Sequence, residues 1–180
     1  MRKVWAVLHF VDTINERFGK IISFLAVGMM GVIVVEVVLR YGFNSPTLWA
    51  LEAATFLYGS YCILGGAYVL LHRAHVNMDI LYARLSPRKR AILDLFTSLL
   101  FFLFIGVMLW HGSMFAWKSV QGLERTWSLW RPPIWPVKLM LPLAALLILL
   151  QGIVKFVRDI ETAVTGREAI AFEVAKKELL

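Results

Sequence analysis

Residues 21–35 of this chain read IISFLAVGMMGVIVV, an apolar run without a charged residue. A half-polar turn extends the run to residue 41. It then reaches the roughly 20 residues that an α-helix needs to cross a bilayer core about 30 Å thick. Three further apolar stretches follow, at residues 53–71, 95–117 and 139–154. The pattern predicts an all-α integral membrane protein with four transmembrane helices.

The composition agrees with a chain that is embedded in lipid. Of its 180 residues, 59% are hydrophobic and 17% are charged, whereas soluble domains have about 25% charged residues. We predict a single membrane domain over residues 1–180. The net charge is +7. The Lys and Arg residues lie between the apolar runs, as residues that set the topology of a membrane protein do. No nucleic-acid partner is therefore expected, and the lipid bilayer is the expected environment.

The distribution of Lys and Arg predicts the orientation of the helices. Fourteen of these residues fall in the flanks on one side of the four helices, and five fall on the other side. Cytoplasmic flanks of membrane helices carry the excess of positive charge. Both termini are therefore predicted to be cytoplasmic, and the connections at residues 42–48 and 118–138 are predicted to face outward.

Local signals predict the boundaries of the segments. Ser45-Pro46 and Ser86-Pro87 each read as an N-cap followed by a proline in the first helical turn. Residues 2–18 and 75–85 carry apolar residues at helical spacing, which predicts short amphipathic helices on the cytoplasmic face. The remaining predicted segments are transmembrane helices at 20–41, 47–71, 89–117 and 138–158, an outward loop at 118–137 and a cytoplasmic tail at 159–180.

Most tryptophans fall at the outward ends of the predicted helices. Such residues typically form an aromatic belt at the depth of the lipid headgroups. This pattern supports the predicted orientation. The tryptophans concerned are Trp49, Trp110, Trp117, Trp127, Trp130 and Trp135.

Glu36 and Arg40 are charged residues inside the first apolar helix, four residues apart with the acid first. That order favours an ion pair within the helix. A charge in a membrane helix is costly and suggests a function. We favour a structural or assembly role, in which the pair locks this helix to the next one through Glu52 or to another subunit. Proton or ion coupling is the alternative.

No motif for catalysis or cofactor binding is present. The chain has no nucleotide-binding loop and no Ser/His/Asp or Cys/His arrangement. His72, His75 and Asp79 share a helical spacing, but a metal site there would need a fourth ligand, and we interpret them as a polar elbow at the cytoplasmic surface. His72 and His111 are predicted to lie about 30 Å apart in depth. The chain is therefore not expected to be an enzyme or to hold a metal, haem or other cofactor.

A series of short motifs runs through the first half of the chain. Residues 36–46 read EVVLRYGFNSP, and WALE at 49–52, LGGA at 64–67 and HVNMD at 75–79 follow. In this order and spacing, the motifs resemble the small permease subunit (DctQ type) of tripartite ATP-independent periplasmic (TRAP) transporters. The family pattern usually has a second acid near Glu52 and a glycine before the histidine.

The second half is similar to one subgroup of that family, which is labelled as mannitol or chloroaromatic type. The supporting motifs are WPVKLM at 135–140 and LQGI at 150–153. The whole resemblance covers roughly residues 15–160.

The resemblance implies a function that depends on partners. The small subunit would bind a large permease subunit that moves substrate by an elevator-type motion, in the bacterial inner membrane. A periplasmic substrate-binding protein would deliver the solute, usually an organic acid. A Na⁺ or H⁺ gradient would drive uptake, with the coupling in the large subunit.

The resemblance also implies roles for particular residues, none of which would bind substrate. Five of them would be assembly or structural charges, and four would form a docking surface for the binding protein. The first group is Glu36, Arg40, Glu52, His75 and Asp79, and the second is Trp127, Trp130, Arg131 and Trp135.

Two other functions fit four apolar helices. A self-sufficient multidrug exporter also carries a glutamate in its first helix, which Glu36 mimics, but Arg40 already neutralises this acid. A membrane anchor of a redox complex would need two histidines at one depth, which the predicted positions of His72 and His111 do not provide.

Overall fold

The computed structural model describes residues 2–72 and 85–165. Among these residues, the only β-structure is one isolated bridge between Arg125 and Pro133. All four α-helices are long and apolar enough to cross a membrane, which confirms the all-α prediction with four candidate spanning helices. The elements are α1 (Arg2–Val37), the π-helical turn η1 (Val38–Gly42), α2 (Ala50–Leu71), α4 (Pro87–Gln121) and α5 (Trp135–Thr165).

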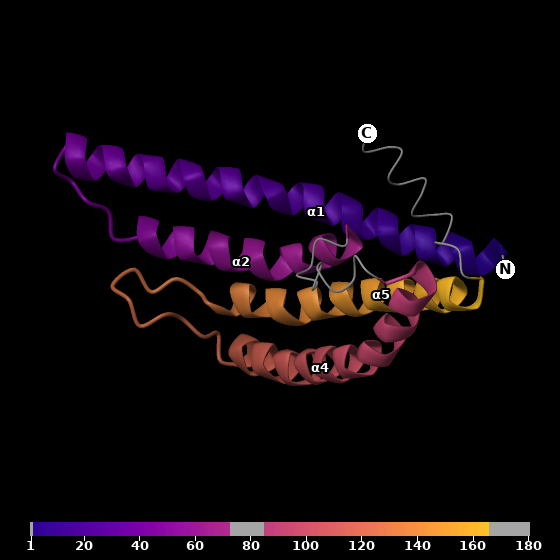
Figure 1. The fold of residues 1–180 in the computed structure, drawn as a ribbon. Coiled ribbons are helices and arrows are strands. Elements are labelled where there is room, and N and C mark those ends of the chain that lie inside the picture. Colours follow the sequence, from indigo (N-terminus) through magenta and orange to yellow (C-terminus); the bar gives the residue numbers. More distant parts are fainter. Residues whose placement is uncertain (1, 73–84, 166–180) are drawn as a thin grey trace.

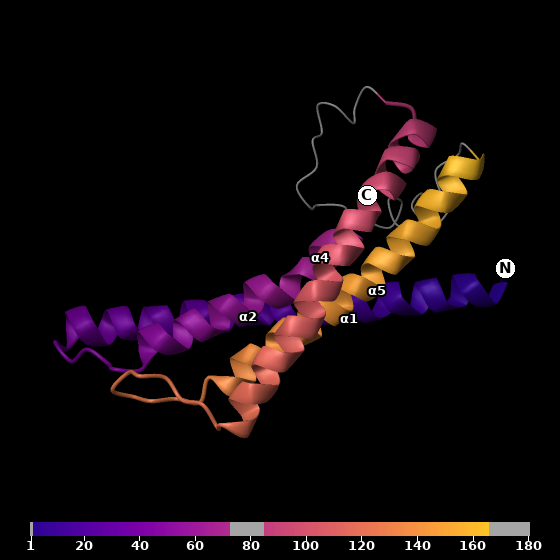
Figure 2. The same ribbon diagram turned by 90° about the horizontal axis from the view of Figure 1, so that it is seen from below.

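The helices form two antiparallel hairpins that pack against each other. α1 packs on α2, α4 packs on α5, and α2 contacts α5, so that the order across the molecule is α1, α2, α5, α4 (Figure 1). Figure 2 shows that the two hairpins cross. The connections at residues 43–49 and 122–134 lie at one end of the molecule, which we call the loop end (Figure 1). The N-terminus and the last turns of α5 lie at the opposite, terminal end.

Three of the helices are longer than a bilayer core. α2 has 22 residues and a length of about 33 Å, close to a core thickness of about 30 Å. α1, α4 and α5 have 36, 35 and 31 residues, so each is roughly 13–21 Å longer than α2. Because both connections lie at the loop end, the extra length lies at the terminal end, where charged residues are frequent.

The start of the chain differs from its prediction. The sequence predicts a separate amphipathic helix over residues 2–18, whereas α1 continues through this region without a break. No proline interrupts it, and Gly19, at the expected break, packs against Tyr68 of α2 instead of opening a turn. The polar side chains of Asp12 and Asn15 contact α5. Polar side chains on the predicted interfacial segment therefore contact α5.

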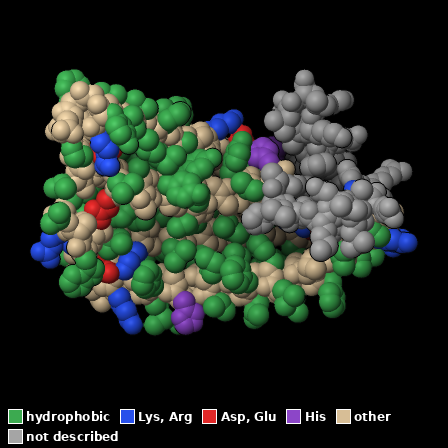
Figure 3. Space-filling model, turned by 60° about the vertical axis from the view of Figure 1, so that its left-hand side comes forward, with side chains coloured by type: hydrophobic (Ala, Val, Ile, Leu, Met, Phe, Trp, Pro, Cys, Tyr) green, Lys and Arg blue, Asp and Glu red, His purple; other side chains and the backbone are tan. Residues whose placement is uncertain are grey.

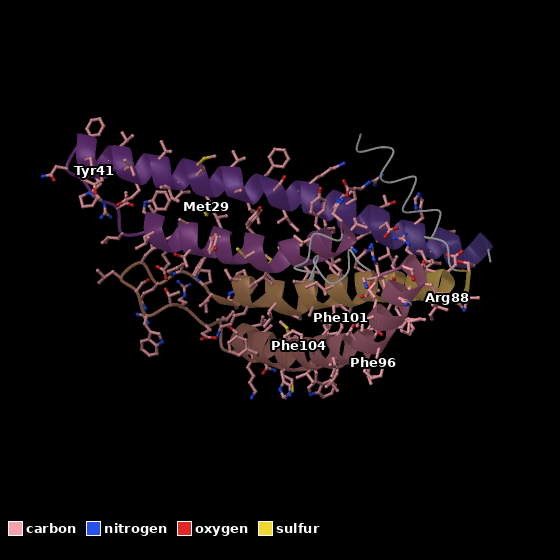
Figure 4. All side chains as sticks on the ribbon, in the orientation of Figure 1. Met29, Tyr41, Arg88, Phe96, Phe101 and Phe104 are labelled. Atoms are coloured by element: carbon pink, nitrogen blue, oxygen red, sulfur yellow. The ribbon has the colours of Figure 1, made fainter. Side chains whose placement is uncertain are left out.

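Small residues allow the helices to approach closely. A Cβ atom on Gly19 would lie 2.0 Å from Cδ2 of Tyr68, and one on Gly152 would lie 2.3 Å from Cε1 of Phe101. Figure 4 shows Phe101 between α4 and α5. Membrane helices associate through such close packing because lipid supplies no hydrophobic driving force between them. The buried alanines at these contacts are Ala50, Ala54, Ala67, Ala91, Ala116, Ala144 and Ala145.

The outer faces of α1 and α4 are apolar and exposed. Phe96 of α4, on the side away from α5 (Figure 4), and Phe24 of α1 are 83% and 73% exposed. Hydrophobic side chains cover the middle of the face in Figure 3, and most charged side chains gather toward its two ends. A surface of this kind is stable only against lipid or another apolar protein surface.

Candidate functional site

The loop end holds the predicted charge pair. Both Nε and Nη2 of Arg40 donate to Oε1 of Glu36, the first at 2.9 Å. The second carboxylate oxygen of Glu36 accepts hydrogen bonds from the backbone N–H of Thr47, at 3.1 Å, and from the Thr47 hydroxyl. Glu36 therefore ties the end of α1 to the connection that leads into α2.

The chain turns sharply around this carboxylate. The helix widens into η1, and the N–H of Ser45 donates to the carbonyl oxygen of Leu39 at 2.9 Å. Asn44 has a φ of 50°, a left-handed conformation that asparagine tolerates well. The sequence predicts that the second helix begins near residue 47, but α2 begins at Ala50. Thr47 is held by Glu36, and its Oγ1 accepts from the N–H of Ala50 at 3.3 Å.

Glu52 lies apart from the Glu36–Arg40 pair, contrary to the expected lock between the first two helices. Its Oε2 accepts a hydrogen bond from Oγ of Ser128 at 2.7 Å. The ring of Trp49 lies 6.3 Å from that of Trp130, centroid to centroid. These two contacts tie the start of α2 to the connection between α4 and α5.

That second connection is an ordered loop. The N–H of Ile134 donates to the carbonyl oxygen of Glu124, and the N–H of Thr126 donates to that of Pro132, both at 3.0 Å. Oγ of Ser128 also accepts from the N–H of Arg131 at 3.1 Å. The two arms of residues 122–134 are thus joined by hydrogen bonds and have a defined shape.

The four predicted docking residues occupy different environments in this loop. Trp127 is completely exposed, and the neighbouring Leu129 is 85% exposed. Arg131 is exposed with a φ of 51°. Trp130 packs on Trp49, and the half-buried Trp135 opens α5. The structure therefore places Trp127 and Leu129 as the apolar tip of the loop.

An ion pair closes the base of the loop. Nζ of Lys138 donates to Oε2 of Glu124 and lies 4.1 Å from the centroid of the Phe115 ring. The hydrogen bond from Lys138 is the main reason that the pKa of Glu124 lies below its ordinary value. The pair connects the loop to the first turn of α5.

This ion pair predicts a dependence of stability on pH. Because folding lowers the pKa of Glu124, its contribution is present above the ordinary pKa of a glutamate and is lost as the pH falls through the folded-state value. Glu124→Gln should lower the thermal unfolding midpoint at about pH 6, and its difference from the original chain should be smaller at about pH 3. An equal difference at both pH values would contradict a role for the ionised carboxylate.

A buried polar network lies at the terminal end, between α1 and α5. Nδ2 of Asn15 donates to Oε1 of Gln151 at 2.6 Å. Nε2 of Gln151 donates to Oδ1 of Asp12 at 3.1 Å, and Arg158 forms an ion pair with the other oxygen of Asp12. Asn15 and Gln151 are 1% and 2% exposed. No sequence pattern predicted this network, although Gln151 is a polar residue within an apolar run.

Further ion pairs connect the other helices at the same end. Nζ of Lys155 lies 2.7 Å from Asp94 of α4 and 2.9 Å from Asp159 of α5. Nε2 of His72, at the end of α2, lies 2.8 Å from Glu16 of α1. Polar contacts at the terminal end therefore join α1 to α2, α1 to α5 and α4 to α5.

Several predicted residues fall outside the described part of the chain. These are His75 and Asp79, together with residues 75–84 of the predicted amphipathic segment and the tail from residue 166 onward. Among the residues that the structure describes, no cluster of three or more His, Cys, Asp or Glu side chains has the arrangement of a metal site.

Comparison with known proteins identifies the family. The model of the family described as "Tripartite ATP-independent periplasmic transporters, DctQ component" matches residues 29–162. The chain belongs to the DctQ family. The matched region includes the Glu36–Arg40 pair, the loop at 122–134 and all of α2.

Individual relatives carry similar names. The chain is 27% identical over 129 residues to the C4-dicarboxylate TRAP transporter small permease protein DctQ of Vibrio cholerae, covering 71% of this chain and 53% of that protein. It is 32% identical over 96 residues to a putative TRAP transporter small permease protein of Haemophilus influenzae, covering 53% and 57%. It is also 23% identical over 139 residues to the sialic acid TRAP transporter permease protein SiaT of Haemophilus influenzae, covering 74% and 22%.

The chain therefore spans about half the length of the two small permease proteins. In this DctQ-family chain, the match to the family model begins at residue 29 and ends at residue 162. It includes Gln151 and Arg158 but not their partners Asp12 and Asn15. One side of the terminal-end network thus lies outside the matched region.

Proposed function

We propose that the chain is the small membrane subunit of a TRAP-type secondary transporter. It would scaffold a large elevator-type permease subunit during uptake of an organic acid or related solute. A periplasmic binding protein would deliver the solute, and Na⁺ or H⁺ coupling would take place in the large subunit. The chain itself would carry no catalytic activity and no cofactor.

One observation carries the scaffold role beyond the family membership. Three acids near the loop end are engaged by groups of the same chain: Glu36 by Arg40 and Thr47, Glu52 by Ser128, and Glu124 by Lys138. The outer faces of α1 and α4 are apolar instead. A subunit that lined a substrate path would direct polar groups into that path, whereas a scaffold presents apolar faces to lipid and partners. The pairing of Glu36 also disfavours the exporter, which would need an accessible carboxylate.

The proposed location is the bacterial inner membrane, with the terminal end in the cytoplasm. The excess of Lys and Arg in the flanks at that end supports this orientation. The loop end, with Trp127 and Leu129 at its tip, would then face the periplasm. The relatives have C4-dicarboxylate and sialic acid in their names and do not support the mannitol or chloroaromatic subgroup.

Co-purification tests the proposal directly. The tagged chain would be isolated from its native membranes in mild detergent, and the proteins that accompany it would be identified by mass spectrometry. We expect a large multi-helix permease subunit. A chain that purifies alone as a homodimer and binds a cationic drug would reject the proposal in favour of the exporter.

Charge reversal at Arg40 tests the assembly role of the loop end. Arg40→Glu would place two acids one helical turn apart and remove the cation that pairs with Glu36. We expect recovery of the complex with the large subunit to fall to a small fraction of the original. Arg17→Glu, at an exposed position of the same helix, is the matched control. Unchanged recovery and uptake of the Arg40 variant would remove this residue from the interface.

The exposed tip predicts where the binding protein docks. Tryptophans at the centre of an interface often contribute about 2 kcal/mol, so Trp127→Ala should weaken binding by about 30-fold. The affinity would be measured with the purified membrane complex and the binding protein. Trp110→Ala is a suitable control, since Trp110 is 70% exposed on the side of α4. Equal affinities of the two variants would place the docking surface elsewhere.

A further inference from the structure

A groove runs along the contact between α1 and α2 at the loop end. Its volume is about 460 Å³, within the range of small-molecule sites. Figure 4 shows Tyr41 of η1 at the loop end and Met29 farther along α1. The residues that line the groove include Met29, Ile33, Arg40, Tyr41, Ala54 and Tyr58.

The polarity of the groove changes along its length. Arg40 and Tyr41 lie at the loop end, where the chain leaves the bilayer in the proposed orientation. The deeper part is lined mainly by the apolar side chains of Met29, Ile33 and Ala54, with Thr55 and Tyr58 beside them. Twelve residues separate Met29 from Tyr41, which corresponds to about 18 Å along a helix. This is close to the depth of one leaflet, half of a core of about 30 Å.

The polar end of the groove contains the hydrogen-bond donors of Arg40. A guanidinium has five N–H groups, and two of those of Arg40 are directed at Glu36. No acceptor for the other three occurs among the described residues, and the Arg40 side chain is 48% exposed. The Glu36 side chain is only 12% exposed. The accessible charge at this end is therefore the cation, and the next residue, Tyr41, is also exposed.

We propose that this groove binds a phospholipid of the leaflet at the loop end. The phosphate accepts hydrogen bonds from Arg40, because guanidinium groups match phosphate oxygens in geometry and charge. One acyl chain lies along Met29 and Ile33 beside the small Ala54. A phospholipid matches this lining because it joins an anionic headgroup to an apolar chain in one molecule. The site does not depend on the proposed role in transport.

Adjacent residues of α1 provide a matched pair of variants. Ile33 lines the groove, whereas Val34 does not line it and is 56% exposed. The purified full chain would be titrated with dioleoylphosphatidylglycerol in detergent and analysed by native mass spectrometry. Ile33→Trp should weaken retention of one lipid by about tenfold, because the larger side chain overfills the groove. Val34→Trp should leave it unchanged.

The headgroup contact has its own test. Arg40→Gln should weaken retention by about fivefold, which corresponds to about 1 kcal/mol for one basic residue near a phosphate. Dioleoylglycerol, which has no phosphate, should bind the original chain more weakly than dioleoylphosphatidylglycerol. Equal binding of these two lipids would overturn the phosphate contact.

A second measurement needs no variant. A phosphatidylglycerol with a photoreactive group in its acyl chain should label the original chain within residues 29–58. Labelling confined to other peptides, or equal retention by the Ile33 and Val34 variants, would overturn the lipid site.

Discussion

Gly152→Leu should destabilise the chain by about 3 kcal/mol, the upper range for overpacking a well-packed contact. A Cβ atom at this position would already lie 2.3 Å from the Phe101 ring. The ring is itself held, since it packs edge-to-face on Phe102, which packs in the same way on Phe156. The α4–α5 contact must therefore open to accept a leucine. An SDS titration followed by circular dichroism would measure the change.

Two companion variants make this prediction specific. Gly106→Leu removes a glycine from the middle of α4, but a Cβ atom there meets nothing within 4 Å, so it should have little effect. Adding Phe101→Ala to Gly152→Leu should recover much of the lost stability, because it removes the ring that the leucine meets. If the Gly106 and Gly152 variants unfold alike, close packing at Gly152 is not the cause.

Asp12→Ala should cost about 3 kcal/mol, the range for removing one partner of a buried ion pair. The side chains of Asp12 and Arg158 are each 16% exposed. Without the carboxylate, the guanidinium keeps its charge and loses its partner, and Gln151 loses an acceptor. The same SDS titration would measure the effect, and we expect α1 to separate from α5 first.

The partner residue provides the control. Asp12→Ala combined with Arg158→Met should be more stable than Asp12→Ala alone, because no charge then remains unpaired. Thr13→Ala is the matched single variant, since Thr13 is exposed and its hydroxyl bonds only to His9 of the same helix. A double variant no more stable than Asp12→Ala would show that the unpaired charge of Arg158 is not what destabilises the chain.

The polar network between α1 and α5 suggests how the two hairpins keep their relative position. Apolar side chains of two helices can pack in many registers with similar energy, whereas a given pair of polar side chains can form its hydrogen bond in only one register. Asn15 and Gln151 meet where the hairpins cross, although 136 residues separate them. Buried polar pairs are known to select one register in helical assemblies. The network is therefore well placed to specify the crossing of α1 over α5.

Local pattern was enough to predict much of this protein. The four apolar runs predicted four helices that are long enough to cross a membrane, because span length and hydropathy are properties of consecutive residues. The Glu36–Arg40 ion pair was likewise predictable, since residues four apart lie on one face of a helix. The order and spacing of the motifs also sufficed to indicate the DctQ family.

Only the tertiary structure decided the contacts between distant residues. The sequence predicted that the Glu36–Arg40 pair locks the first helix to the second through Glu52, or to another subunit. In the structure Glu36 binds Thr47, and Glu52 binds Ser128 at 76 residues' separation. The polar residues near the N-terminus suggested a helix in contact with water, yet Asp12 meets Arg158 of α5. Periodicity states which residues share a face of one helix. Packing and polar pairing between helices decide which face of one helix contacts which face of another. These interactions depend on residues that are far apart in the sequence.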